Sequence, residues 1–249
     1  ALMDALVGNT EREPILFSNL QDGIPTKSFM LLRHDIDISP LNALEMATLE
    51  HRMGVVATYF IFPQSRFYNI QSPRFIDIPR KLVELGHEIG LHYDCRTLEH
   101  MDRCMEIVET NVELLEHLSV SPVCSIARHQ PGQINKNCIS SDRYIDAYGL
   151  VNTIPYYSDS CGAWRSEFID CVLSDNIPDQ FQLLIHPEFW RERPVDRWDR
   201  LDECVSEEVA GLLGSAEEEG NGWQIRAYVE EYDRWASGFA SNDVETTQT

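Results

Sequence analysis

Apolar runs alternate with helical patterns along most of the chain. The run at 29–32 is continuous, as expected for a strand covered on both faces, and the run at 55–62 is interrupted only by Thr58 and is rich in β-branched and aromatic residues. Further strand-like runs lie at 122–127 and 181–185. The segment that follows Thr97 has apolar residues three or four positions apart, which indicates a helix with one face on a core. About seven strands joined by helical crossovers result. We therefore predict an α/β fold, a single distorted (β/α)7-type barrel with parallel strands.

Composition and charge narrow the class of protein. Of 249 residues, 20 are basic and 41 acidic, so the formal net charge is -21. This excess of acidic groups argues against nucleic acid as a partner. The hydrophobic share of 43% is that of an ordinary globular protein, long enough for a large core. We expect a barrel domain over residues 1–240 and a flexible polar tail over 241–249.

Membrane and redox features point to an intracellular protein. The longest apolar run, at 55–62, is far shorter than the roughly 20 residues of a membrane-spanning helix, and no secretion signal pattern opens the sequence. The seven cysteines include no pair with the two-residue spacing of zinc or redox motifs. We expect reduced thiols, a cytoplasmic location and no membrane insertion.

Polar residues gather where the predicted strands end, and this edge is the catalytic face of a parallel barrel. Asp35 and Asp37 follow the first such strand, and residues two apart on extended chain point to one face. Two carboxylates there require a cation, either Arg33 in an ion-pair network or a bound divalent metal. His92 ends another predicted strand and is the best placed imidazole ligand.

One carboxylate and two neutral imidazoles can hold a zinc-like ion with an open position, which lowers the pKa of bound water to about 7. The sequence contains no glycine-rich phosphate loop, no serine nucleophile elbow and no cysteine nucleophile motif. These observations favour metal-assisted hydrolysis as the class of reaction.

Several segments resemble, in order, the motifs of the polysaccharide deacetylase superfamily, the carbohydrate esterase family four type that includes chitooligosaccharide deacetylases. The resemblance extends over residues 29–190. Residues 34–37, HDID, resemble the first motif, which implies Asp35 as catalytic base and Asp37 as metal ligand. Residues 86–92, GHEIGLH, resemble the segment that leads into the second motif, which implies His92 as a metal ligand.

The later motifs imply the remaining roles. Residues 128–132, RHQPG, resemble the third motif, a groove wall, while Asp159 with Trp164 and Arg165 resembles the fourth, which supports the base and the pocket. His186, three residues after Leu183, resembles the general acid of the fifth. The resemblance therefore implies Asp35, His186, Asp159 and Arg165 in catalysis, and we expect Arg128, Trp164 and Trp190 to contact the sugar.

Two positions depart from the family pattern. Ile36 separates aspartates that are adjacent in the family, and Arg96 stands where the family has its second metal histidine. His129, at the end of a neighbouring strand, is the preferred third ligand. Asp94 or His87 could serve instead, and His186 could bind metal rather than act as the acid.

The resemblance implies a metal-dependent hydrolase that removes an N-acyl group, in the first place N-acetyl, from an amino sugar or polysaccharide precursor. The expected cofactor is one divalent metal, zinc before cobalt or manganese, and the expected partner is a carbohydrate, including a precursor of a cell-surface polysaccharide. A deformylase or other amidohydrolase acting on a non-sugar amide is one alternative. A non-catalytic carbohydrate-binding barrel, suggested by Arg96, is the other.

Overall fold

The computed structural model describes residues 12–94, 101–130, 143–164, 168, 170, 171, 174, 176–190 and 196–218. The chain divides into two units, Ala1–Arg197 and Trp198–Thr249, and helix α6 (Arg197–Glu218) begins at this boundary. The predicted barrel domain over 1–240 covers both units and stays a prediction. The expected tail over 241–249 lies outside the described residues, as do Arg96 and Arg165.

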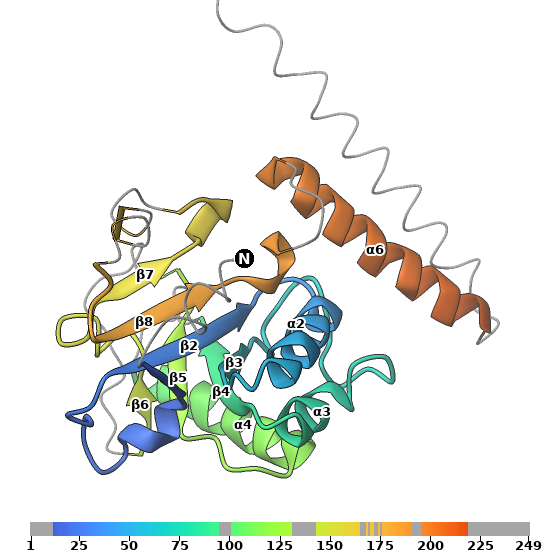
Figure 1. The fold of residues 1–249 in the computed structure, drawn as a ribbon. Coiled ribbons are helices and arrows are strands. Elements are labelled where there is room, and N and C mark those ends of the chain that lie inside the picture. Colours follow the sequence, from blue (N-terminus) through green and yellow to red (C-terminus); the bar gives the residue numbers. More distant parts are fainter. Residues whose placement is uncertain are drawn as a thin grey trace, which may run out of the picture. The chain divides into compact units, whose positions relative to one another are not determined.

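Seven parallel strands form a curled sheet in the order β6-β5-β4-β3-β2-β8-β7 (Figure 1). A further short strand, β1 (Glu13–Ile15), pairs with β2, also in parallel. The predicted parallel barrel is confirmed as a half-barrel, since no described residues pair β6 with β7. The strands are β2 (Phe29–Ile36), β3 (Thr58–Ile61), β4 (Glu88–Tyr93), β5 (Ser125–Arg128), β6 (Ile145–Asp146), β7 (Tyr156–Ser158) and β8 (Gln180–Ile185).

Three helices, α2 (Pro40–Arg52), α3 (Ile78–Glu84) and α4 (Met101–Ser119), cover one face of this sheet (Figure 1). The first begins where the sequence provides a cap, because the side chain of Ser39 accepts a hydrogen bond from Asn42 N–H and Pro40 occupies the first turn. Gly86 follows α3 with a φ of 89°, a left-handed conformation that glycine adopts without strain. Three single-turn helices, η1 (Phe17–Leu20), η3 (Ser160–Gly162) and η4 (Pro187–Phe189), complete the described elements of the first unit.

The central strand β2 is buried on both faces, and its residues alternate between two apolar clusters. Met30, Leu32 and Ile36 pack on the helix side, whereas Phe29 and Leu31 belong to a smaller cluster inside the curl of the sheet. Successive side chains of a strand point to opposite faces. Residues 33 and 35 therefore share the inner face, and residue 34 lies on the helix side.

One cysteine departs from the expected redox state. Cys104, in α4, is disulfide-bonded, which corrects the prediction that the thiols are reduced. Disulfides persist mainly in oxidising compartments, so the cysteines do not support the predicted cytoplasmic location. Among the described residues, none of the helices combines the length and the apolar character needed to cross a membrane.

Candidate active site

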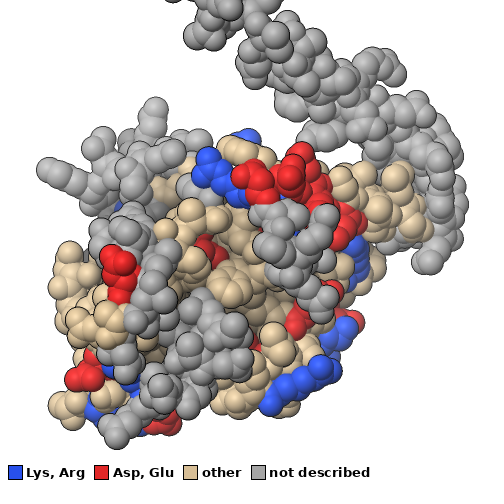
Figure 2. Space-filling view, turned by 45° about the horizontal axis from the view of Figure 1, so that its top comes forward, with Lys and Arg blue, Asp and Glu red and all other residues tan. Residues whose placement is uncertain are grey.

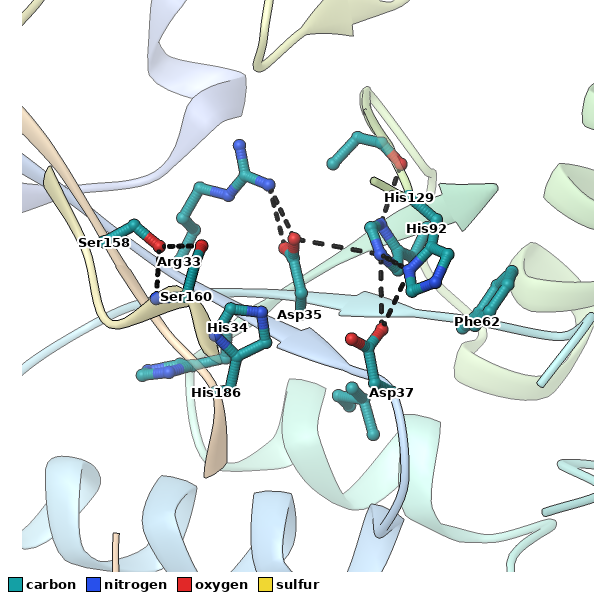
Figure 3. Close-up of polar contacts among 12 residues, drawn as sticks. Arg33, His34, Asp35, Asp37, Phe62, His92, His129, Ser158, Ser160 and His186 are labelled. Atoms are coloured by element: carbon teal, nitrogen blue, oxygen red, sulfur yellow. Dashed lines mark hydrogen bonds and ion pairs between the residues drawn. The ribbon is translucent and has the colours of Figure 1, made fainter. Parts of the chain in front are cut away.

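Five candidate side chains come from the carboxyl ends of four strands of the sheet (Figure 3). Asp35 lies near the end of β2 and Asp37 just beyond it, His92 lies in β4, and His129 and His186 directly follow β5 and β8. Parallel strands bring their carboxyl ends to one edge of a sheet. The pairing order β5-β4-β3-β2-β8 therefore assembles residues that are far apart in the sequence.

Asp37, His92 and His129 form a compact group of potential metal ligands. Their ligand atoms all lie within 4.8 Å of one another. Asp37 Oδ1 lies 3.3 Å from His92 Nε2 and 3.3 Å from His129 Nδ1, and the two nitrogens are 3.1 Å apart. The structure thus brings together the three residues that the sequence proposed as ligands, although their role remains a prediction.

The chemistry of these donor atoms fits a divalent cation. His92 Nδ1 lies 2.8 Å from the Ala127 carbonyl oxygen and donates to it, so the lone pair of the neutral ring is on Nε2, facing the group. In the part of the chain that the structure describes, no group donates a well-formed hydrogen bond to the buried Asp37 Oδ1. One carboxylate and two imidazoles are a common set of protein ligands for catalytic zinc.

The electrostatics of the group point the same way. Burial raises the pKa of Asp37, but the close polar contacts with His129 and His92 outweigh it and hold that pKa well below its ordinary value. Burial lowers the pKa of His92, yet the charges of Asp35 and Asp37 produce a net increase. The two carboxylates thus favour a positive charge in this space, and a bound metal ion can provide that charge.

The alternative third ligands do not join this group. His87 is buried at the start of β4, where Nδ1 accepts from Ala57 N–H at 3.2 Å and Nε2 lies 3.0 Å from the Ala47 carbonyl oxygen. Its ring therefore serves the packing of α2 against the sheet. Asp94 lies outside the group of ligand atoms that converge on Asp37.

Asp35 is paired with Arg33 on the inner face of β2. Both side chains are buried, and Arg33 Nη2 donates to Asp35 Oδ1 at 2.9 Å and to Oδ2 at 2.8 Å. The guanidinium lies between two rings, 4.9 Å from the centroid of Phe60 and 4.7 Å from that of Tyr148. The sequence left two sources of positive charge open for the aspartates, Arg33 or a bound metal. In the structure Arg33 balances the charge of Asp35, while Asp37 faces the histidines of the candidate metal group.

Arg33 keeps Asp35 ionised. Burial raises the pKa of this carboxyl, but the charges of Arg33, His92 and His186 outweigh burial and lower it below its ordinary value. Asp35 is therefore a carboxylate at neutral pH, the form that can accept a proton. It also lies close to the candidate metal group, with Oδ2 3.8 Å from His92 Nε2.

Asp159 is hydrogen-bonded to His186, the candidate acid, and its predicted support of the base stays a prediction. Its Oδ1 lies 2.7 Å from His186 Nδ1, and both of its oxygens accept from the His186 backbone N–H at 3.1 Å. β7 pairs with β8 so that Ser158 lies beside Leu184. Asp159, which follows β7, therefore lies close to His186, which follows β8. Burial lowers the pKa of His186, but Asp159 raises it well above its ordinary value.

The predicted sugar-binding residues have mixed surroundings. Trp190 Nε1 donates to Asp159 Oδ2 at 2.8 Å, so this indole helps to fix Asp159, which is hydrogen-bonded to the candidate acid His186. Trp164 is half-buried, with its ring 4.7 Å from Phe168 and 6.0 Å from Trp190. Arg128 is buried at the end of β5 and offers little surface to a ligand. Of the three, Trp164 stays the predicted residue for a direct contact with sugar.

The acidic side chains visible on one face of the described residues do not form one continuous surface (Figure 2). On the face shown in Figure 2, Asp and Glu residues fall into separate groups within a mostly uncharged described surface. The formal net charge of -21 is therefore not concentrated at one place on this face. The local charges of Arg33 and of the histidines matter more to the site than the net charge of the chain.

Fold and site together define a parallel α/β half-barrel with a candidate metal centre at the carboxyl ends of its strands. No protein-family model and no curated protein matches the chain. Solved structures that resemble it include members of the CE4 family, the carbohydrate esterases of family four.

Three of these structures illustrate the likeness. A CE4 family pseudoenzyme from Bacillus anthracis has a TM-score of 0.45 and 13% identity over 75% of this chain and 62% of its own. The peptidoglycan deacetylase PdaC from Bacillus subtilis has a TM-score of 0.46 and 13% identity, with 86% and 98% covered. The chitin deacetylase of Colletotrichum lindemuthianum has a TM-score of 0.47 and 12% identity, with 74% and 84% covered.

The chain thus spans less than two thirds of the length of that pseudoenzyme. Identities and TM-scores this low say nothing about activity. Activity depends on the side chains that this chain itself places at the site.

Proposed function

We propose that this protein is a metal-dependent hydrolase that removes an N-acyl group, in the first place N-acetyl, from an amino sugar or a polysaccharide precursor. One observation supports this above all. The candidate ligands Asp37, His92 and His129 converge beside a buried, ionised carboxylate, Asp35, on the edge of the sheet that also carries a protonated imidazole, His186. A proton acceptor, a proton donor and a cation site together are what amide hydrolysis requires.

Asp37, His92 and His129 would hold one divalent cation, with zinc the first candidate and cobalt or manganese the next. When bound, the cation supplies Lewis acidity towards the amide carbonyl and lowers the pKa of water. Asp35 accepts the proton of the attacking water. Arg33 holds both carboxylate oxygens and so keeps Asp35 ionised and fixed in orientation.

His186 donates a proton to the nitrogen of the leaving amine. Its Nδ1 is held by Asp159 at 2.7 Å, which leaves Nε2 as the atom that releases the proton. Trp190 and the backbone N–H of His186 complete the hydrogen bonds to Asp159. The water's proton goes to Asp35 and the amine's proton comes from His186, so the reaction yields a carboxylic acid and a free amine.

The substrate is assigned to carbohydrates because the sequence resembles the deacetylase motifs, and Trp164 is the candidate surface for a sugar ring. A precursor of a cell-surface polysaccharide fits this assignment. The disulfide at Cys104 supports an oxidising compartment rather than the cytoplasm that the sequence predicted.

Acetate release after metal reconstitution tests the proposal. The full chain is stripped with a chelator, loaded with zinc, cobalt or manganese, and incubated with N-acetylated oligosaccharides, N-acetylated nucleotide sugars and N-formyl or N-acetyl amides that carry no sugar. We expect one acetate and one free amine per turnover from the sugars, only in the loaded protein. Turnover of the sugar-free amides alone would favour an amidohydrolase, and glycan binding without acetate release would favour a non-catalytic barrel.

A further inference from the structure

A buried chain of polar side chains lies on the helix side of the sheet. His34 in β2 is fully buried, with Nε2 2.8 Å from Glu50 Oε1 in α2 and Nδ1 3.1 Å from the Ile185 carbonyl oxygen at the end of β8. The hydroxyl of Tyr59 in β3 donates to Glu50 Oε2 at 2.7 Å. One imidazole thus connects a helix to the ends of two neighbouring strands.

The donors and acceptors of this chain require an extra proton. The Ile185 carbonyl can only accept, so His34 Nδ1 carries a hydrogen. An ionised carboxylate can also only accept, yet Glu50 Oε1 faces His34 Nε2 at hydrogen-bonding distance. A proton therefore lies between them, and the pair is either an imidazolium with a carboxylate or an imidazole with a carboxylic acid. In both forms the pair is neutral as a whole.

His87 does not provide this proton. Its Nδ1 accepts from the Ala57 N–H and its Nε2 faces the Ala47 carbonyl, which defines the neutral ring with a hydrogen on Nε2. Its Nδ1 lies 3.9 Å from Glu50 Oε2, beyond hydrogen-bonding distance. The proton is therefore shared by His34 and Glu50 alone.

Stability does not explain why an ionisable pair occupies this place. Met30, Leu32 and Ile36, on the same face of β2, all belong to the large apolar cluster. An apolar residue at position 34 would continue that pattern. Replacing a buried ion pair by well-packed apolar side chains is often neutral or stabilising, so its presence suggests a role in position rather than in folding energy.

The pair holds the peptide that precedes the candidate acid. The carbonyl of Ile185 and the backbone N–H of His186 belong to one peptide unit. Its carbonyl accepts from His34, and its N–H donates to Asp159. His34 also directly precedes Asp35 in the chain. The same residue is therefore linked to Asp35 by a peptide bond and, through the Ile185 carbonyl, to the backbone of His186.

We propose that His34 and Glu50 are positioning residues, which hold the peptide between residues 185 and 186 and thereby keep His186 in place relative to Asp35. This inference rests on the proposed function, in which those two groups move the protons. The pair acts through His186 and Asp35 and itself contacts no substrate.

Three variants of the full chain test the role. The triple variant H34F/E50L/Y59F replaces every polar member by an apolar side chain of similar size, so that no buried charge or hydroxyl is left behind. Glu50→Gln is the conservative change, because its amide can donate to a neutral His34 and accept from Tyr59. Glu88→Gln is the matched control, since Glu88 is also a buried carboxylate with two hydrogen bonds, from Ser125 Oγ and Ser18 N–H, but lies at the opposite ends of the strands.

Two measurements are made on each variant, the titration of His186 by NMR with labelled histidine and the values of kcat and KM. In the triple variant we expect a pKa of His186 that falls towards its ordinary value, and a kcat about 100-fold lower with little change in KM. Glu50→Gln should keep kcat within a factor of about three of the unaltered protein. Glu88→Gln should leave both the His186 titration and kcat unchanged.

A folded triple variant with an unchanged His186 titration and unchanged kcat would overturn the positioning role. So would an equal loss of kcat in Glu88→Gln, because the effect would then accompany the loss of any buried carboxylate. If the unaltered protein releases no acetate, the proposed function fails, and the His186 titration in the same variants still decides whether His34 and Glu50 hold it.

Discussion

Arg33 is the residue whose surroundings most directly determine the chemistry of Asp35. It is fully buried between the rings of Phe60 and Tyr148 and donates to both oxygens of Asp35. Lysine cannot reproduce a planar guanidinium stacked between two rings. The state of the candidate base thus depends on this one neighbour.

Replacing Arg33 by methionine should therefore leave a buried carboxylate without its counter-charge. We expect a loss of about 3–5 kcal/mol in the free energy of unfolding, measured in urea, together with loss of hydrolysis. Lys27→Met is the control, because the exposed ion pair of Lys27 with Glu13 should contribute about 1 kcal/mol or less. Equal effects of the two changes would contradict the importance given to burial.

Asp35 and Asp37 should respond differently to the same chemical change. Asp37→Asn should lower both metal content and activity, because it removes a charged ligand. Asp35→Asn should keep the metal and reduce kcat by about 100-fold or more, as expected for loss of a general base. Elemental analysis of metal per chain, measured beside kcat, distinguishes the two roles. Loss of metal in Asp35→Asn alone would reverse the assignment.

Asp159 should govern the titration of His186. Because the pKa of His186 is raised, its stabilising interaction with Asp159 is fully present below pH of about 6.5, its ordinary pKa, and is lost as the pH rises through the raised value. In Asp159→Asn we expect that pKa to fall, and the decline of stability with rising pH above 6.5 to become shallower. NMR titration and urea unfolding at several pH values measure both effects.

Among the elements, the contact between β3 and β4 explains a glycine in the middle of a buried strand. A Cβ at Gly90 would lie 2.5 Å from the ring of Phe60, which also packs against the guanidinium of Arg33. Because Gly90 in β4 has no side chain, the ring of Phe60 in β3 has room to pack there. The same ring packs against Arg33 of the Arg33–Asp35 pair in β2. The packing of Gly90 against Phe60 therefore affects the position of Arg33 at the site.

Gly90→Ala should consequently destabilise the protein by about 1–3 kcal/mol, since Phe60 would have to move, and should lower kcat as well. Gly214→Ala in α6 provides the opposite control. Among the described residues, no atom lies within 4 Å of a Cβ there, and alanine in a helix should add about 0.5–1 kcal/mol. Thermal unfolding of the two variants compares them, and a stable, fully active Gly90→Ala protein would contradict the proposed link.

For the whole molecule, the metal group connects the ends of β2, β4 and β5, so a bound ion should stabilise the fold. At a free zinc concentration of 100 times its Kd, the gain should be about 2.7 kcal/mol. Differential scanning calorimetry with chelator and then with added zinc measures it as a shift of Tm. Asp37→Asn should show a much smaller shift. An identical shift in that variant would place the ion elsewhere.

Local periodicity was enough to predict a distorted parallel α/β barrel, because strands and helices have different repeats that are visible in the sequence. The carboxyl-end rule indicated Asp35, Asp37 and His92 as candidates, since each follows or ends an apolar run. The resemblance to the deacetylase motifs then implied Asp37 as the ligand, and His129 was chosen because it ends a neighbouring strand. The hydrogen bond between Asp159 and His186 was not predicted. The environment of Asp159 depends on the pairing of β7 with β8, and nothing in the residues around Asp159 indicates which strand lies beside it.

The sequence by itself thus determined which residues stand at strand ends and which types of donor they offer, because these depend on short-range alternation. Only the tertiary structure decided how protons and charges are shared: Arg33 with Asp35, Asp159 with His186, and His34 with Glu50 and the Ile185 carbonyl. Each of these contacts joins opposite charges or fixed donors and acceptors in a buried space. Their strength therefore depends on distance and desolvation, which exist only once the strands have paired.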